Sequence, residues 1–145
     1  MKMQLSRDVN VLIIEDDHYY NDLLAKRIRS LKNKPDINGR YRLKIQQIFE
    51  PEQFLDKKDN GMEQSGRTIA FVDFYLGSGR NGLQVSGKLA DMNEDIKIVL
   101  MSHSEEVIRE LEQSGSDANL YTNLVKHEYT PEICSIIVEN YINNL

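Results

Sequence analysis

Three acidic residues follow directly on an apolar run near the start of the chain, and another acidic residue ends a later run. The first three are Glu15, Asp16 and Asp17, and the other is Asp73. Clustered carboxylates repel one another unless a cation joins them, and a hard divalent ion bound through oxygen meets that need. Magnesium is the natural candidate, because it takes one or two carboxylates together with water and phosphate oxygens. We therefore expect a Mg²⁺ site formed by Glu15, Asp16 and Asp73.

Two further polar residues, Ser102 and Lys126, end apolar runs later in the chain. A hydroxyl and an ammonium at such positions would hold and neutralise the other oxygens of a phosphoryl group. Taken singly, each feature has a plainer explanation. Ser102 with Glu105 has the spacing of a helix capping box, Lys126 could be a solvated lysine, residues 15–17 could begin a helix, and Asp73 could be a turn residue. Their joint placement at the ends of four apolar runs favours one shared site.

The apolar runs that precede these residues predict a parallel β-sheet. Four runs are mainly aliphatic and one is mixed with polar residues: 9–14, 68–72, 96–101 and 120–125, with the mixed run at 43–49. Continuous apolar runs are typical of strands buried on both faces of a parallel sheet, and the mixed run suits an edge strand. In such sheets the functional site lies at the carboxyl ends of the strands, beside the topological switch point.

Segments with helical spacing of apolar residues alternate with these strands. They are expected over residues 17–32 and 51–57, around Val85, Leu89 and Met92, around Val107, Ile108 and Leu111, and from Thr130 onward. Polar stretches at 32–42 and 56–67 predict surface loops, and the glycine-rich segment 77–82 lacks the Lys-Ser/Thr of a phosphate-binding loop and is interpreted as a flexible loop. Five strands alternating with five helices predict an α/β fold, a doubly wound three-layer sandwich around a parallel sheet.

The last helix carries apolar residues on two neighbouring stripes. We expect Thr130 to be its N-cap, followed by Pro131 in the first turn. The stripe predicted to face the core consists of Ile133, Ile136, Ile137 and Tyr141. The second stripe consists of Cys134, Val138 and Ile142, and it is interpreted as additional packing rather than as an interface.

Length and charge narrow the function classes. The chain has 145 residues, with 18 Lys and Arg against 23 Asp and Glu, and a net charge of -5. This length predicts one domain, 1–145, and the acidic balance argues against direct binding of nucleic acid, which requires cations at the phosphates. The single cysteine, Cys134, cannot form an internal disulfide. With no secretory signal and no apolar stretch of about 20 residues, the expected location is the cytoplasm, away from membranes.

Five segments, taken together, resemble the receiver domain of two-component response regulators over essentially the whole chain. They are residues 11–17, 71–77, 81–83, 98–102 and 123–126. No single segment is specific, but their order is that of this family and their intervals are close to those of the family. The resemblance implies a flavodoxin-like fold, with a five-stranded sheet in the order 2-1-3-4-5. It also implies phosphorelay signalling, in which the chain catalyses only its own phosphotransfer and dephosphorylation and is not otherwise an enzyme.

The resemblance assigns a role to each candidate residue. It implies that Asp73 accepts the phosphoryl group, that Glu15, Asp16, Asp73 and the backbone carbonyl of Tyr75 hold Mg²⁺, and that Ser102 and Lys126 contact the phosphoryl oxygens. The partners it implies are a sensor histidine kinase or phosphotransfer protein and a downstream protein. It also allows a homodimer through the face made by the fourth helix, the fifth strand and the fifth helix.

Several residues depart from the family pattern around this site. Asn123 stands where an aromatic switch residue is usual, and Tyr121, which faces the same side of the strand, could replace it. His127 stands in place of a proline in cis linkage, and His103 replaces a small residue and could narrow the entrance or titrate near neutral pH. Tyr75 would overhang the site, and its bulk could lengthen the phosphorylated lifetime.

The spacing between Ser102 and Lys126 allows a second alignment of the chain with the family pattern. The interval from Ser102 to Lys126 is two residues longer than is common, with the excess expected within residues 115–119. An alignment with Thr122 at the lysine position is rejected, because residues 123–126 followed by 130–133 match a strand end and a helix start better.

Two other functions compete with a phosphorylated receiver. Asn123, His103 and His127 favour a pseudo-receiver that docks partners independently of phosphorylation. A phosphatase of the haloacid dehalogenase type also uses an aspartate at a strand end. It typically has a second aspartate two residues later, where this chain has Tyr75, and this alternative is therefore disfavoured.

Overall fold

A five-stranded parallel sheet forms the centre of the molecule. The computed structural model describes residues 7–56, 67–77, 81–113 and 121–145, and for Tyr121 it describes the backbone only. Within these ranges the strands run β2-β1-β3-β4-β5, and every neighbouring pair is parallel. They are β1 (Asp8–Ile14), β2 (Arg42–Ile48), β3 (Thr68–Asp73), β4 (Lys97–Ser102) and β5 (Tyr121–Val125). The predicted strands and strand order are confirmed, with bounds that agree to within one residue.

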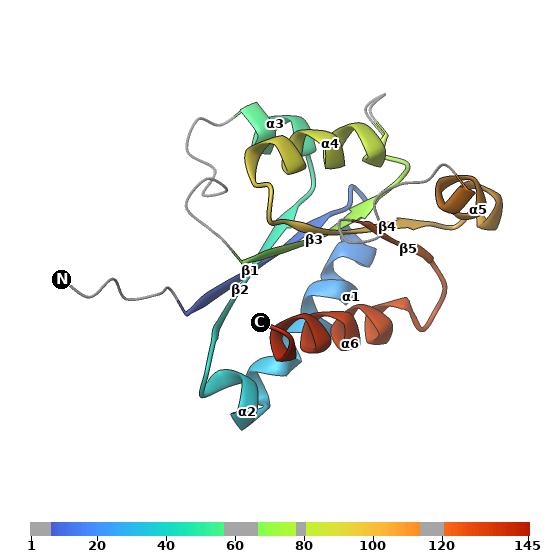
Figure 1. Cartoon of the computed structure of the whole chain (residues 1–145). Coiled ribbons are helices and arrows are strands. Elements are labelled where there is room, and N and C mark those ends of the chain that lie inside the picture. The colour runs from blue at the N-terminus through green and yellow to red at the C-terminus, as the bar shows by residue number, and fades with distance from the viewer. Residues whose placement is uncertain (1–6, 57–66, 78–80, 114–120) are drawn as a thin grey trace.

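Helices cover both faces of the sheet, which confirms the three-layer sandwich (Figure 1). On one face lie α1 (His18–Arg29), α2 (Pro35–Asn38) and α6 (Thr130–Asn143), and α1 continues into the 3-10 helix η1 (Ser30–Asn33). On the other lie α3 (Pro51–Asp56), α4 (Gly82–Met92) and α5 (Glu105–Gln113). In the described ranges, none of these helices has both the length and the apolar composition that crossing a membrane requires.

The short helix α2 was not predicted and lies in a stretch that was interpreted as a loop. Pro35 occupies its first turn, where a missing N–H costs nothing, and Ile37 is buried against the core. One turn of helix has too few residues to show a periodic pattern, which explains why the sequence did not reveal it. Because of α2, the fourth and fifth predicted helices are α5 and α6 here.

The segment after β3 also differs from its prediction as a flexible loop. Asn81 forms a capping box with Gln84, since the Asn81 side chain accepts the Gln84 N–H at 2.9 Å and the Gln84 side chain accepts the Asn81 N–H at 3.2 Å. Gly82 already belongs to α4. Residues 81–82 therefore begin a helix, and residues 78–80 lie outside the described ranges.

Two apolar clusters, one on each face, hold the sheet in place. β3 is buried along its whole length, as predicted for a central strand. Its residues alternate between the two clusters, with Ile69 and Phe71 facing α1 and α6, and Ala70 and Val72 facing α4 and α5. β2 lies at the edge and exposes alternate residues, as its mixed sequence predicted.

The prediction for the inward face of α6 was right only in part, since Ile137 and Tyr141 of the predicted stripe do pack against the core cluster. The buried residues are Cys134, Val138 and Ile142 from the second stripe, whereas Ile136 of the predicted stripe is 56% exposed. The other three residues of the predicted stripe are half-buried. Both stripes have helical period, so the period alone does not decide which one meets α1. The small side chains of Cys134 and Ser135 on the buried face permit a close approach of the two helices.

The N-cap prediction for α6 was wrong. The cap residue is Tyr129, which makes no capping bond with its side chain. The Thr130 hydroxyl instead accepts the His127 N–H at 2.8 Å and donates to the Val125 carbonyl at 3.2 Å. Thr130 thus closes the β5–α6 loop that follows Lys126. This is the loop in which His127 stands in place of the proline of the family pattern.

Candidate functional site

The three carboxylates predicted to share a site lie together at the carboxyl end of the sheet. Glu15 and Asp16 follow β1, and Asp73 is the last residue of β3. β1 and β3 are paired neighbours, with Ile14 opposite Val72, so the residues that follow them meet. One oxygen from each carboxylate lies within 4.8 Å of the other two. Glu15 and Asp73 are buried and Asp16 is exposed, so the group reaches the surface on one side.

Lys126 enters the same site from the end of β5. Its backbone N–H donates to the Ser102 carbonyl at 2.7 Å, at the last pair of the β4–β5 register. Its ammonium nitrogen lies 2.6 Å from Glu15 Oε1 and 3.5 Å from Asp73 Oδ1, and the side chain is only 4% exposed. This contact places Lys126, and not Thr122, at the site. The residues 115–119, to which the longer spacing was attributed, lie outside the described ranges.

The pKa of Glu15 is strongly shifted in this site. Burial raises the pKa of Glu15 to about 8, with a further increase from the neighbouring Asp73 carboxylate, and the Lys126 ammonium opposes both effects only in part. Glu15 Oε2 is buried and makes no hydrogen bond to any described residue. A divalent cation would supply a partner for that oxygen and relieve the repulsion between carboxylates. The three residues therefore fit a hard cation bound through oxygen.

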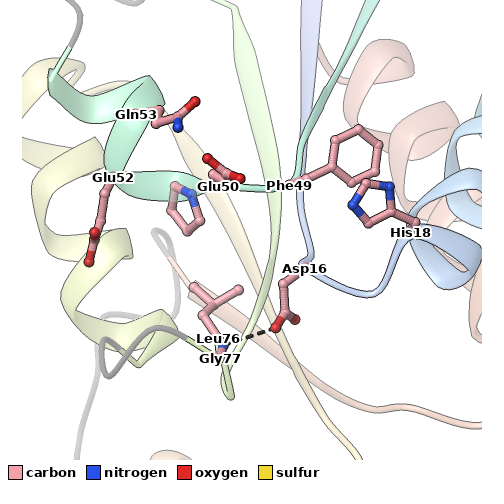
Figure 2. A pocket seen from close by; sticks show the side chains of 9 residues that line it. Asp16, His18, Phe49, Glu50, Glu52, Gln53, Leu76 and Gly77 are labelled. Atoms are coloured by element: carbon pink, nitrogen blue, oxygen red, sulfur yellow. Dashed lines mark hydrogen bonds between the residues drawn. The ribbon is translucent and has the colours of Figure 1, made fainter.

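Two glycines shape the backbone around the carboxylates. The Gly77 N–H donates to Asp16 Oδ2 at 2.9 Å, and a Cβ at Gly77 would lie 2.8 Å from that oxygen (Figure 2). A Cβ at Gly82 would lie 2.2 Å from the Asp73 carbonyl oxygen, where no side chain fits. Position 82 therefore requires glycine because it meets the backbone of Asp73, whereas a side chain at Gly77 would displace the Asp16 carboxylate.

Asn21 supports the site from α1, and it was not among the predicted site residues. Its Nδ2 lies 3.0 Å from the Glu15 carbonyl, 3.3 Å from that of Ile13 and 3.4 Å from that of Ile48, and its Oδ1 accepts a hydrogen bond from Gln47 Nε2 at 3.1 Å. The side chain is fully buried and joins the ends of β1 and β2. Its sequence signal was an amide next to the apolar stripe of a helix, a position where a polar residue needs a buried partner.

The residue that caps α5 is Ser104, and the capping-box interpretation of Ser102 with Glu105 is wrong. Ser104 Oγ accepts the Val107 N–H at 3.2 Å, whereas Ser102 is fully buried and its Oγ accepts the Ser104 N–H at 3.1 Å. The plainer explanation does hold for Asp17, which caps α1 by accepting the Tyr20 N–H at 3.1 Å.

The residues that depart from the family pattern surround the site. The Tyr75 side chain is 59% exposed and packs edge-on against Phe74, with ring centroids 5.0 Å apart. His103 is exposed, and Asn123 is half-buried, with an Oδ1 that meets no hydrogen-bond partner among the described residues. His127 Nδ1 accepts the Tyr129 N–H at 3.1 Å. The side chain of Tyr121 lies outside the described part of the chain.

A pocket of about 490 Å³ adjoins Asp16 on the side of β2 and α3. Its lining includes Asp16, His18, Phe49, Glu50, Gln53 and Gly77. The rings of His18 and Phe49 are stacked, with centroids 4.1 Å apart and an interplanar angle of 11°. Figure 2 shows this stack on the side of the pocket opposite α3, with Asp16 between the stack and Gly77. The exposed side of the carboxylate group therefore borders a hollow with an acidic and aromatic lining.

Comparisons with known proteins show a likeness in structure at low sequence identity. No protein-family model matches the chain, and no curated protein matches it in sequence. A response regulator from Colwellia psychrerythraea is 16% identical, with a TM-score of 0.65 over 94% of this chain and 98% of that one. The BeF3-activated DrrB receiver domain is 13% identical, with a TM-score of 0.65 over 93% and 97%.

A third solved structure, the response regulator TrrA from Thermotoga maritima in complex with Mg²⁺-BeF, is 17% identical. Its TM-score is 0.57, over 92% of this chain and 98% of that one. The three likenesses each span more than nine-tenths of both chains, so they concern the whole fold and not one motif. The chain therefore has the flavodoxin-like fold of response regulator receiver domains.

Proposed function

We propose that this protein is a receiver domain that accepts a phosphoryl group on Asp73 from a histidine kinase or phosphotransfer protein, and thereby switches its protein contacts in phosphorelay signalling. The observation that carries the proposal is the convergence of Glu15, Asp16, Asp73 and Lys126 at one end of a sheet with the receiver fold. In this reading the chain acts only on its own phosphoryl group.

The chemistry assigned to the chain is attack by a carboxylate on a phosphoramidate. An oxygen of Asp73 attacks the phosphorus of a phosphohistidine, the P–N bond breaks, and the imidazole nitrogen leaves with the bond's electron pair. The product on this chain is an acyl phosphate. The Lys126 ammonium, 3.5 Å from Asp73 Oδ1, is placed to neutralise charge on the transferring oxygens, and the buried Ser102 hydroxyl is assigned to another oxygen of the same group.

Glu15, Asp16, Asp73 and the backbone carbonyl of Tyr75 would hold Mg²⁺ in this reading. When bound, the cation offsets the carboxylate charge and polarises the phosphoryl oxygens. The buried, unpartnered Glu15 Oε2 and the exposed Asp16 support this assignment, since one gains a partner and the other leaves a side open to water and phosphate. Two of the similar solved structures are described with BeF3 or Mg²⁺-BeF, which supports Mg²⁺ as the cation proposed for this chain.

The output of the switch is assigned to protein contacts at the face formed by α5, β5 and α6. Ser102 ends β4, and Asn123 and Lys126 belong to β5 and the loop after it, so events at Asp73 reach this face through short connections. A change of partner preference there is a population shift between two packings. A downstream protein or a second copy of the chain would bind this face.

The test is labelling with a small phosphodonor such as acetyl phosphate in the presence of Mg²⁺. We expect the native protein to take up one phosphoryl group and Asp73→Asn to take up none. Asp36→Asn, an exposed aspartate on α2, is the matched control and should label normally. Equal labelling of the native protein and Asp73→Asn would refute the assignment of Asp73.

A second candidate function is a pseudo-receiver that binds partners independently of phosphorylation. It is favoured by Asn123 at the switch position, with its unpartnered Oδ1, and by His127 in the loop after Lys126. NMR spectra with beryllofluoride, recorded with and without Mg²⁺, separate the two functions. Shifts that require Mg²⁺ and spread from Asp73 to β5 favour the phosphorylated receiver, whereas unchanged spectra favour the pseudo-receiver.

The lifetime of the phosphorylated state is a separate test of Tyr75. We assign to its exposed side chain, two residues after Asp73, the role of obstructing an attacking water. We expect Tyr75→Asn to lose its phosphoryl group faster than the native protein does. An equal or slower rate in the variant would refute this role.

A further inference from the structure

We propose that Tyr20 is a positioning residue for Lys126, whose ammonium is held by the face of the Tyr20 ring while it lies between Glu15 and Asp73. The inference rests on the proposed function, because it concerns the lysine assigned to the phosphoryl oxygens. It gives a role to a residue that the motifs at the strand ends do not include.

The contact itself is short and lies in a dry environment. Lys126 Nζ is 4.3 Å from the centroid of the Tyr20 ring, within the range of a cation–π interaction. The same nitrogen is 2.6 Å from Glu15 Oε1 and 3.5 Å from Asp73 Oδ1. The Lys126 side chain is 4% exposed, so little water competes, and cation–π attraction is strongest where the cation is desolvated.

The two carboxylates do not surround the lysine ammonium on every side, and the Tyr20 ring lies on a side that they leave open. An ammonium has three N–H donors and no acceptor. The two carboxylates account for two directions around the nitrogen, and the Tyr20 ring lies on a further side. Without the ring, a buried cation would face an apolar wall on that side, and its position would depend on the carboxylates alone.

The ring of Tyr20 is itself held firmly. Its backbone N–H is part of the α1 cap, since it donates to Asp17 Oδ1 at 3.1 Å. The side chain packs against the apolar cluster shared by α1 and α6, and its ring lies 6.5 Å from that of His103. The hydroxyl is buried and makes no well-formed hydrogen bond to a described residue. The position of the ring therefore depends on packing, and not on the phenol oxygen.

The ring suits a lysine that must change partners. In the proposed reaction Lys126 moves from Glu15 and Asp73 toward the phosphoryl oxygens. A third carboxylate would hold the ammonium with a directed hydrogen bond and cancel more of its charge. The face of a neutral ring attracts the ammonium without doing either, so Lys126 stays in the site and keeps its N–H groups available.

The experiment compares Tyr20→Leu with Tyr20→Phe in the full chain. Leucine keeps an apolar side chain and removes the ring face, whereas phenylalanine keeps the ring and removes only the hydroxyl. With acetyl phosphate and Mg²⁺ we expect Tyr20→Leu to be phosphorylated about tenfold more slowly, and Tyr20→Phe to match the native rate. Tyr19→Leu is the matched control on the same helix, because Tyr19 is 74% exposed, and its rate should be unchanged.

A spectroscopic readout separates positioning from general packing. A ring face at this distance shifts the NMR signals of the Lys126 ε-methylene protons upfield. We expect that shift to be retained in Tyr20→Phe and lost in Tyr20→Leu, while the amide signals of β1 and β3 keep their dispersion. If Tyr20→Leu does not fold, Tyr20→Met takes its place, since methionine fills a similar volume without a ring.

Two results would overturn the inference. One is a native rate and a native Lys126 shift in the ringless variant, and the other is a Tyr20→Phe protein as slow as Tyr20→Leu. Failure of the proposed function would give a different experimental result from failure of this inference. In that case the native protein would not be labelled at all, yet the Lys126 shift, which needs no phosphodonor, would still report whether Tyr20 positions the lysine.

Discussion

The two ends of β1 carry the same kind of ion pair in opposite environments. At the start of the strand, Asp8 lies 2.6 Å from Arg42 and 2.9 Å from Lys44, close to solvent, and these cations lower its pKa to about 2. Just past the other end, Glu15 lies 2.6 Å from Lys126, yet burial raises its pKa to about 8. Equally short ion pairs thus accompany opposite pKa shifts, because desolvation and the Asp73 carboxylate at the buried end outweigh the attraction of the lysine.

The balance of charge differs as well. At the exposed end two cations surround one carboxylate, whereas at the buried end one lysine faces three carboxylates. The first arrangement is complete and gains nothing from a further ion. The second has an excess of negative charge and a buried oxygen, Glu15 Oε2, that has no hydrogen-bond partner among the described residues. The buried end therefore has a charge imbalance that a cation would relieve, whereas the exposed end does not.

Replacing the lysine at each end of β1 should give the largest difference in the free energy of unfolding between the two ends. Lys126→Met leaves the Glu15 and Asp73 carboxylates buried without their cation, and we expect it to lower the free energy of unfolding by about 3 kcal/mol at pH 8. Lys44→Met removes an exposed cation from a carboxylate that keeps Arg42, and no measurable change is expected. Urea unfolding of both variants without divalent metal provides the measurement. Equal losses would contradict the role of burial.

A second prediction concerns the close packing of the backbone at the buried end. Gly82→Ala would place a Cβ 2.2 Å from the Asp73 carbonyl oxygen, and we expect a loss of about 1–3 kcal/mol together with weaker Mg²⁺ binding. Gly87→Ala is the matched control in the same helix, because no atom lies within 4 Å of its Cβ position. That variant should gain about 0.5–1 kcal/mol from helix propensity. Thermal unfolding of the pair tests this, and an equally stable Gly82→Ala would show that the site tolerates movement of Asp73.

The pH dependence of stability should have opposite signs at the two ends. The pKa of Glu15 is raised in the folded state, so between its ordinary value of 4.5 and about 8 the folded protein binds the extra proton. Stability therefore falls as pH rises through that window, with a slope of at most about 1.4 kcal/mol per pH unit. Unfolding of native protein and Glu15→Gln at pH 6 and pH 8, with a chelator present, measures it. A native slope no steeper than that of Glu15→Gln would contradict the raised pKa.

The smallest change in stability is expected from the titration of Asp8. Its pKa is lowered from 3.8 to about 2, so its contribution to stability is present above pH 3.8 and is lost as pH falls toward 2. The pair is exposed, and added salt should weaken the effect further. NMR titration of the Asp8 carboxyl carbon in native protein and in Arg42→Ala provides the test. We expect the midpoint to rise in the variant, and an unchanged midpoint would show that Arg42 does not hold the pKa down.

Much of the architecture followed from local pattern. The strands were predictable because buried parallel strands form continuous apolar runs, and α1 was predictable because Leu24, Ile28 and Leu31 recur at helical spacing. The acidic residues were predictable as a group because the carboxyl ends of parallel strands share one edge. The order of the motifs added the strand order and the register of Lys126.

The errors have a common cause. The buried face of α6, the cap formed by Ser104 and the hydrogen bonds of Asn21 all depend on which neighbouring segment a side chain meets. Two apolar stripes or two serines are equivalent in the sequence, and only the surrounding chain distinguishes them. The same holds for Tyr20, whose contact with Lys126 joins residues 106 positions apart by their numbers in the sequence.

The strands, the longer helices and the charged residues at the strand ends were predictable from the sequence alone, because hydrophobic period and residue type act locally. Only the tertiary structure decided what those charges do. The pKa of a carboxylate depends on the water that the fold removes and on the cations that it brings near, and the chain folds differently around each end of β1. For this reason Asp8 and Glu15, seven residues apart in the chain, became an exposed ion pair and the centre of a candidate cation site.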